Sequence, residues 1–188
     1  MEYIKTQIED VVVLQPKIFG DDRGYFFESF NKKEFEKNIG RKINFCQDNE
    51  SKSSYGVLRG LHFQKPPYTQ SKLVRVIQGK VLDVVVDLRE DSKTFGESVS
   101  VELNDENKNQ LFVPKGFAHG FVVLSETAIF SYKVDNYYAP DYEDGLMYDD
   151  KQLNIDWSID KDNILLSDKD KKNDNLKDVY KFKGELYA

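Results

Sequence analysis

The chain contains only two histidines, and glycines mark the apolar stretch around each of them. His62 lies in Arg59-Gly60-Leu61-His62-Phe63-Gln64, and His119 lies in Phe117-Ala118-His119-Gly120-Phe121. If the first stretch is a strand, His62 points to the opposite face from Leu61 and Phe63. A neutral imidazole in an apolar lumen suits a general base. The residue pattern leaves equally open that each histidine is a core residue hydrogen-bonded to a backbone carbonyl.

A metal ion is the first alternative, because β-barrels often hold one. Clustered ligands commonly need two histidines close together, a carboxylate and a third histidine. Here the position two residues after His62 is Gln64, and the chain has a single cysteine. We therefore expect no catalytic metal. Neither GxxxxGK[ST] nor GxGxxG occurs in the sequence, and we expect no cofactor.

Three basic residues stand near these stretches. Arg23 lies in a turn that enters an aromatic strand (DDRGYFFE), Arg59 precedes His62 by three residues, and Lys72 begins the next strand. Arginine suits a phosphate group because its planar fork donates two parallel hydrogen bonds. The alternative interpretation is ordinary surface charge.

Tyrosines follow one another in SYKVDNYYAP, at Tyr132, Tyr137 and Tyr138. A tyrosine that points into a barrel can act as an acid or stack on a base. Core packing and strand propensity are the more common use of tyrosine.

The elements that must carry these residues are predicted to be strands. Leu73–Arg89 holds two β-branched runs around a hairpin-like break at Gln78-Gly79. Further short strands are predicted at 98–103, 111–113, 120–124 and 128–134. Many short strands separated by turn signals predict an all-β sandwich or barrel.

Helix signals are few. Asn31 followed by Glu34 resembles a capping box, and Gly40 is a stop signal, which predicts a short helix between them. Ser167 followed by Asp170 fits the same pattern and predicts a second helix over KKNDNLK.

Length and composition limit the function classes. A chain of 188 residues suits one domain, with a polar, charge-dense segment from about residue 168. The net charge of −6 argues against non-specific nucleic-acid binding. No apolar run approaches the ~20 residues of a membrane helix. Cys46 has no partner for a disulfide within the chain, so we expect a cytoplasmic protein.

Three ordered segments make the chain recognisable. GVLRGLHFQ, QSKLVRVIQGKVLDVVVDLR and FVPKGFAHGFVVL closely resemble the dTDP-4-dehydrorhamnose 3,5-epimerase family, as do DDRGYFFESF and CQDNESKS. The resemblance runs from about Gly20 to Asp170. It implies a cupin-like jelly roll, a metal-free homodimer, and dTDP-4-dehydro-6-deoxy-D-glucose as the substrate, converted to dTDP-4-dehydro-L-rhamnose.

The resemblance also implies residue roles. His62 matches the base, Asp170 its partner carboxylate, Tyr132 the acid, and Lys72 the cation near the carbon 4 oxygen. The alternative interpretation of Asp170 is a helix cap, and in that case Asp168 is the alternative partner carboxylate of His62. The matched substrate contacts are Arg23 and Arg59 for the diphosphate, Glu28, Gln47 and Asn49 for the nucleoside, Tyr138 for thymine, His119 for the sugar pocket, and Glu143 and Lys169.

Other functions remain open from the sequence. A single-site epimerase or a 3,4-ketoisomerase on a related nucleotide-linked 4-keto sugar would share the barrel and the nucleotide contacts. A nucleotide other than dTDP is compatible with Gln47, Asn49 and Tyr138. A non-enzymatic sugar-binding barrel and a metal-dependent cupin are disfavoured, the first by the match to all four chemical roles and the second by the missing ligands.

Overall fold

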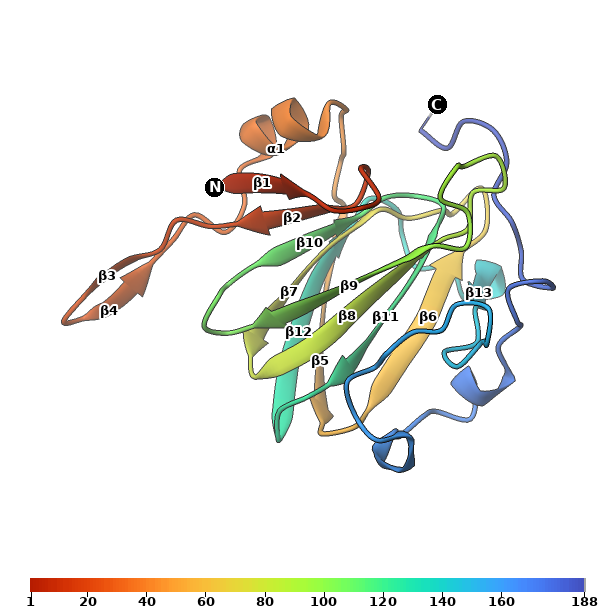
Figure 1. The fold of residues 1–188 in the computed structure, drawn as a ribbon. Helices are drawn as coiled ribbons and strands as arrows, with labels where there is room; N and C mark the ends of the chain where they lie inside the picture. Colours follow the sequence, from red (N-terminus) through yellow and green to blue (C-terminus); the bar gives the residue numbers. More distant parts are fainter. Residues whose placement is uncertain (188) are drawn as a thin grey trace.

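Two antiparallel sheets face each other and enclose a hydrophobic core (Figure 1). The computed structural model describes residues 1–187. The first sheet has the order β1 (Glu2–Lys5), β2 (Val12–Gln15), β10 (Gln110–Val113), β7 (Lys72–Gln78), β12 (Thr127–Val134) and β5 (Gln47–Ser54). The second has the order β13 (Glu143–Gly145), β6 (Leu58–Gln64), β11 (Phe117–Val123), β8 (Lys80–Asp87) and β9 (Ser98–Asn104). This arrangement confirms the expected all-β jelly roll.

The remaining elements lie outside the two sheets. They are a hairpin of β3 (Phe19–Asp21) and β4 (Gly24–Phe26), the helix α1 (Lys32–Ile39), and the short 3₁₀ helices η1 (Pro140–Tyr142), η2 (Lys161–Asn163) and η3 (Asp170–Lys172). The hairpin projects away from the sheets (Figure 1). In the described part of the chain, no helix is long and apolar enough to cross a membrane.

The break at Gln78-Gly79 is a turn, but the predicted hairpin is wrong. β7 pairs with β10 and β12, whereas β8 pairs with β11 and β9. The chain therefore crosses from one sheet to the other at this turn. The physical reason is that Val76 and Val81 pack into the same core between the sheets, so the two strands face each other instead of lying side by side.

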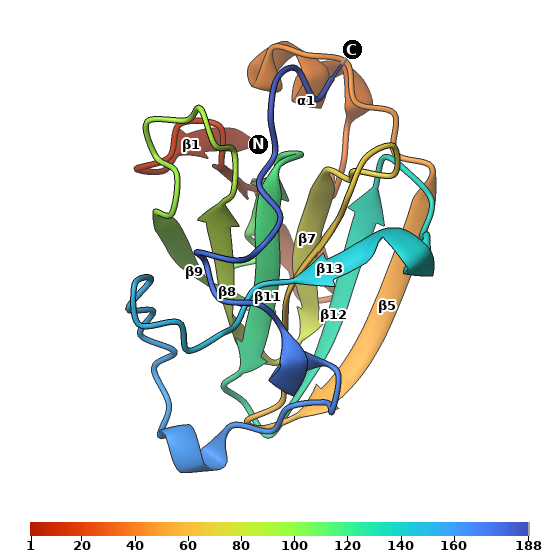
Figure 2. The ribbon, with the colours of Figure 1, turned by 90° about the vertical axis from the view of Figure 1, so that its right-hand side faces the viewer.

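The outer faces of both sheets are also covered. Helix α1 packs on the first sheet, where Phe35 meets Phe112 edge to face at a ring-centroid distance of 5.2 Å. The chain after β13 runs across the second sheet (Figure 2). Within this segment, the polar stretch from about 168 carries Leu176, Val179 and Phe182, which are buried against that sheet. β8 is thus buried on both faces.

One predicted helix forms and the other does not. Asn31 caps α1 by accepting from the backbone of Glu34 at 3.3 Å, and Gly40 ends it in the left-handed conformation. After Ser167 the chain forms only the 3₁₀ turn η3. The predicted longer helix is wrong because the chain becomes extended at Asn173 and bonds to the neighbourhood of β13 instead, with Asp174 donating to Gly145 at 3.2 Å.

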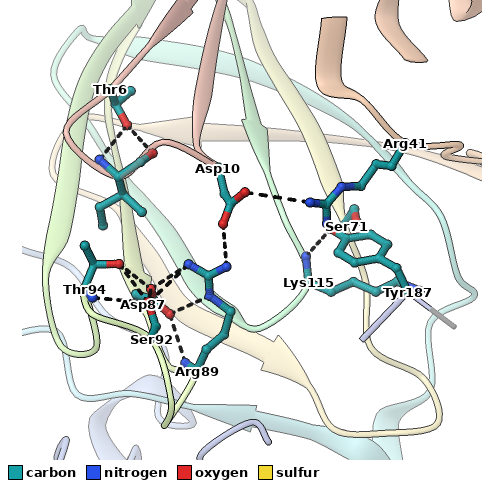
Figure 3. Close-up of polar contacts among 11 residues, drawn as sticks. Thr6, Asp10, Arg41, Ser71, Asp87, Arg89, Ser92, Thr94, Lys115 and Tyr187 are labelled. Atoms are coloured by element: carbon teal, nitrogen blue, oxygen red, sulfur yellow. Dashed lines mark hydrogen bonds and ion pairs between the residues drawn. The ribbon is translucent and has the colours of Figure 1, made fainter. Parts of the chain in front are cut away.

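A polar network ties the N-terminal turn and the C-terminal residues to the sheets (Figure 3). Arg89 bonds the buried Asp87 at 2.8 Å and Asp10 at 2.6 Å. The Tyr187 hydroxyl lies 2.9 Å from the Ser71 hydroxyl, directly before β7. Because Asp87 and Ser71 are both buried, these bonds fix the ends of β8 and β7.

Candidate active site

A cavity of about 560 Å³ opens between the two sheets. Many of the predicted site residues line it: Arg59, His62, Lys72, His119, Tyr132, Tyr138, Glu143, Lys169 and Asp170. Apolar side chains form the rest of its wall, among them Val57, Leu58, Phe121, Phe130, Leu165 and Leu166. A concave site with a few convergent polar groups on an apolar wall is typical of small-molecule binding.

His62 faces this cavity from β6, whereas Leu61 and Phe63 point outward into the core that covers the second sheet. This is the alternation predicted for a strand. Gly60 lets β6 approach β11, because a Cβ at Gly60 would lie 2.6 Å from the Cα of Gly120, and its φ is +135°. The close approach explains the glycines beside both histidines.

Asp170 contacts His62 with Oδ1 2.5 Å from Nε2. Burial alone would raise the pKa of Asp170, but its bonds with His62 and Ser167 outweigh burial and lower that pKa. The carboxylate is therefore ionised at neutral pH. The backbone N–H of Asp170 donates to the Ser167 hydroxyl at 3.1 Å, while the Asp170 side chain points to His62. Asp168 is exposed and pairs with Lys171 instead.

Lys72 and Tyr132 line the cavity from β7 and β12 of the opposite sheet. The Lys72 ammonium donates to the carbonyl of His62 at 3.4 Å. Burial lowers the pKa of Lys72 to about 8, although the carboxylates of Glu143 and Asp83 oppose this. Burial, reinforced by Glu143, raises the pKa of Tyr132. At neutral pH the cavity thus holds a cationic lysine and a protonated tyrosine.

His119 is held differently from His62, although the two are direct partners in the β11–β6 register. Its Nε2 lies 3.0 Å from both carboxylate oxygens of Asp83, and both side chains are buried. Burial lowers the pKa of His119 and raises the pKa of Asp83. Asp83 was not among the site residues predicted from the sequence. Its available signal was an acid inside the apolar run Val81–Val86.

Three residues from separate segments meet at the cavity wall. The Tyr138 hydroxyl donates to Glu143 at 2.7 Å, and Lys169 forms an ion pair with the same carboxylate. Burial would raise the pKa of Glu143, but the bonds from Lys169 and Tyr138 lower it. The bond to Glu143 raises the pKa of Tyr138 to about 12. Exposed Arg59 donates to Ser53 at 3.0 Å.

The other predicted residues do not line the cavity of their own chain. Arg23 lies on the hairpin that projects from the sheets (Figure 1). It pairs with Asp21, and 90% of its side chain is exposed. Glu28 follows that hairpin and accepts from Asn31. Gln47 and Asn49 lie on the edge strand β5, bonded to each other at 2.8 Å. Gln47 also accepts from the backbone of Tyr138 at 3.3 Å, so this pair lies beside the cavity wall.

Within residues 1–187, no three His, Cys, Asp or Glu side chains come together as a metal site would require. The double-sheet jelly roll and its cavity define a class of protein: an acid–base enzyme on a cupin-like fold. The family model described as dTDP-4-dehydrorhamnose 3,5-epimerase matches residues 5–178. The chain therefore belongs to this family, whose members are isomerases.

Individual relatives agree over nearly the whole chain. The dTDP-4-dehydrorhamnose 3,5-epimerase of Shigella flexneri is 56% identical over 170 residues, which cover 90% of this chain and 93% of the relative. The crystal structure of dTDP-4-dehydrorhamnose 3,5-epimerase from Elizabethkingia anophelis NUHP1 superposes with a TM-score of 0.91 at 52% identity, over 95% and 97% of the two chains. That of dTDP-6-deoxy-D-glucose-3,5-epimerase from Legionella pneumophila Philadelphia 1, in complex with dTDP-4-keto-L-rhamnose, has a TM-score of 0.91 at 49% identity, over 95% and 94%.

Proposed function

We propose that this chain inverts carbons 3 and 5 of dTDP-4-dehydro-6-deoxy-D-glucose to give dTDP-4-dehydro-L-rhamnose. The observation that carries the proposal is a single cavity that these four side chains line: His62, Asp170, Lys72 and Tyr132. The His62–Asp170 pair lies on the side of the second sheet, and Lys72 and Tyr132 come from the first sheet. Both carbons flank the ketone at carbon 4, so removing either proton yields an enolate without a cofactor. Inversion needs a base on one face of the sugar and an acid on the opposite face.

His62 acts as the base in this proposal. Because its Nε2 is occupied by Asp170, its Nδ1 is the nitrogen left to take a proton from carbon. The C–H electron pair becomes a carbon–carbon double bond to carbon 4, and the carbonyl π pair moves onto oxygen. Asp170 holds the imidazole in the required tautomer and stabilises the imidazolium that forms.

Lys72 stabilises the charge that develops on the carbon 4 oxygen. A donor fixed in a desolvated site is worth ~3 kcal/mol in the transition state. Tyr132 then donates its proton to carbon from the opposite face, and the carbonyl re-forms. Its raised pKa keeps it protonated until that step. Proton exchange with solvent returns His62 and Tyr132 to their starting states before the next inversion.

We assign the remaining predicted residues to binding of the nucleotide and the sugar. Arg59 bonds the diphosphate, Tyr138 stacks on thymine, and Gln47 and Asn49 lie beside it. His119 lines the sugar pocket, and Glu143 and Lys169 make further substrate contacts.

We further propose a homodimer in the cytoplasm, in which a second copy supplies Arg23 and Glu28. The hairpin that carries Arg23 exposes Phe19, Tyr25 and Phe26 by 54%, 60% and 71%, as expected of a surface that another chain covers. Light scattering should report a dimer. Arg23→Ala and His62→Ala proteins, each inactive alone, should regain activity when mixed, since one cavity of the mixed dimer is then complete. No recovery in dimers shown to have exchanged would place Arg23 outside the partner's cavity.

Proton NMR of dTDP-4-dehydro-6-deoxy-D-glucose with the protein in heavy water tests the reaction. We expect deuterium at carbons 3 and 5, and a rhamno-configured product when a reductase is coupled. Exchange at one carbon only would identify a monoepimerase, and migration of the ketone a 3,4-ketoisomerase; either would overturn the proposal. His62→Ala should abolish exchange at both carbons, and exchange at the wild-type rate would remove His62 from the mechanism.

A further inference from the structure

The carboxylate of Asp170 reaches His62 from a separate piece of chain, the turn η3. The chain shortly before this turn is bonded to β6 through its backbone, with Leu165 accepting from Leu58 at 3.0 Å, whereas the turn itself reaches β6 through side chains. Among the side-chain hydrogen bonds described for residues 167–174, those of Asp170 and Asn173 are the ones that reach β6. Asn173 directly follows η3, and its Nδ2 donates to the carbonyl of Gly60 at 3.4 Å.

The Asn173 amide occupies space that a side chain at position 145 would fill. A Cβ built on Gly145 would lie 2.3 Å from Oδ1 and 2.4 Å from Cγ of Asn173. Gly145 does not have a positive φ, so its backbone would accept alanine. The absent side chain is therefore explained by the amide of Asn173. Gly145 is also the residue of β13 that stands opposite His62 in the β13–β6 register.

Gly60 interacts with both Asn173 and Asp170. Its carbonyl accepts from Asn173, and its backbone N–H contributes to lowering the pKa of the Asp170 carboxyl. Both side chains that join this stretch to β6 thus interact with the peptide groups of Gly60, two residues before His62. The backbone bonds of Asp174 reach β13 and the residues after it, not β6.

We propose that Asn173 is a positioning residue of the reaction: its amide, seated over Gly145 and bonded to Gly60, docks the turn that holds Asp170 on His62. The inference rests on the proposed function, because it gives Asp170 its task. Asn173 touches no reacting atom and acts through the carboxylate. Gly145 belongs to the same arrangement because it provides the space for the amide.

Two substitutions disturb the docking from opposite sides. Asn173→Ala removes the amide, and Gly145→Ala displaces it. Each should lower kcat for deuterium exchange at both carbons by roughly 10- to 100-fold, the effect of misplacing a catalytic group by about 1 Å. KM should change little. Asn175→Ala is the matched control: this exposed residue, two positions on, has no side-chain hydrogen bond in the described structure, and its variant should keep wild-type kcat.

A double-mutant cycle separates positioning from a purely structural role. In an Asp170→Asn background, Asn173→Ala should cost nothing further, because the group that it positions is already lost. Gly145→Ala and Asn173→Ala should likewise not add to each other. Thermal unfolding of every variant establishes that the proteins compared are folded, and if Asn173→Ala unfolds, the cycle is run with Gly145→Ala.

Several outcomes would overturn the inference. These are wild-type kcat in folded Asn173→Ala and Gly145→Ala proteins, or the same fold loss with and without the Asp170 carboxylate. A loss of thermal stability with unchanged kcat would equally assign Asn173 to folding alone. Failure of the proposed function is distinguishable, because it shows in other proteins: as exchange at one carbon or migration of the ketone with the wild type, or as exchange retained in His62→Ala.

Discussion

Replacing Lys72 by methionine should remove activity and stabilise the protein at neutral pH. Lys72 lies in the cavity wall, where burial lowers its pKa from 10.5 to about 8. The charge that is useful to an enolate oxygen is therefore held at a cost to folding. Methionine has a similar length and no charge, and it can pack against the apolar wall of the cavity.

The size of the effect follows from the difference in pKa. Each pKa unit corresponds to ~1.4 kcal/mol, so a charged Lys72 costs at most about 3 kcal/mol at pH 7. The native state binds the proton less readily than the unfolded state, so wild-type stability rises between pH 8 and pH 10.5. The advantage of Lys72→Met should be largest below pH 8 and mostly gone at pH 10. At pH 7 it corresponds to a Tm higher by roughly 6–12 °C at most.

Urea unfolding of both proteins at pH 7 and pH 10 measures this difference, and comparing the two pH values cancels changes in packing. Exchange at carbons 3 and 5, measured in parallel, should fall by at least ~100-fold in Lys72→Met. A variant that is less stable than wild type by the same amount at both pH values would refute the reasoning, because Lys72 would then carry no burial penalty.

Three further outcomes are expected. Tyr132→Phe should largely spare enolate formation but impair inversion; NMR that shows equal loss of exchange and inversion would contradict the division of roles. Asp83→Asn removes a carboxylate that supports the charge on Lys72, so the alkaline limb of the kcat/KM profile should move to lower pH, and an unmoved limb would argue against this coupling. A chelator should leave the rate unchanged, whereas inactivation reversed by added metal would show that the site needs an ion.

The strands could be predicted from the sequence because alternation and β-branched runs are local signals. Their partners could not. The turn at Gln78-Gly79 indicated a hairpin, but the pairing of β7 and β8 with other strands depends on contacts distant in the sequence. The predicted helix after Ser167 failed for a similar reason. Its capping bond does form, yet bonding of Asp174 to Gly145 draws the chain into an extended course.

Some residues of the candidate site could be predicted from the sequence pattern, some only from family resemblance, and some not at all. The pattern alone singled out both histidines but left their task open. The match of Asp170 to His62 came from family resemblance, since no spacing rule connects residues 108 positions apart. Asp83 was missed because an acid in an apolar strand has no visible partner until β8 and β11 lie side by side. Arg23 pairs with Asp21 and does not line the cavity, so its match to a diphosphate contact stays a prediction that the chain by itself does not test.

The protein contains two histidine–aspartate pairs, His62–Asp170 and His119–Asp83, and they differ in their exposure to the cavity. His62 and His119 are register partners, and each bonds an aspartate through Nε2. Asp83 belongs to the strand beside His119, and although His119 borders the cavity, only 7% of its side chain is exposed. Asp170 comes from a turn at the cavity wall, and 26% of the His62 side chain stays exposed. A base must reach its substrate as well as hold a carboxylate. What distinguishes His62 is therefore its access to the cavity. It keeps this access because its carboxylate partner comes from the C-terminal segment at the cavity wall, and not from a neighbouring strand.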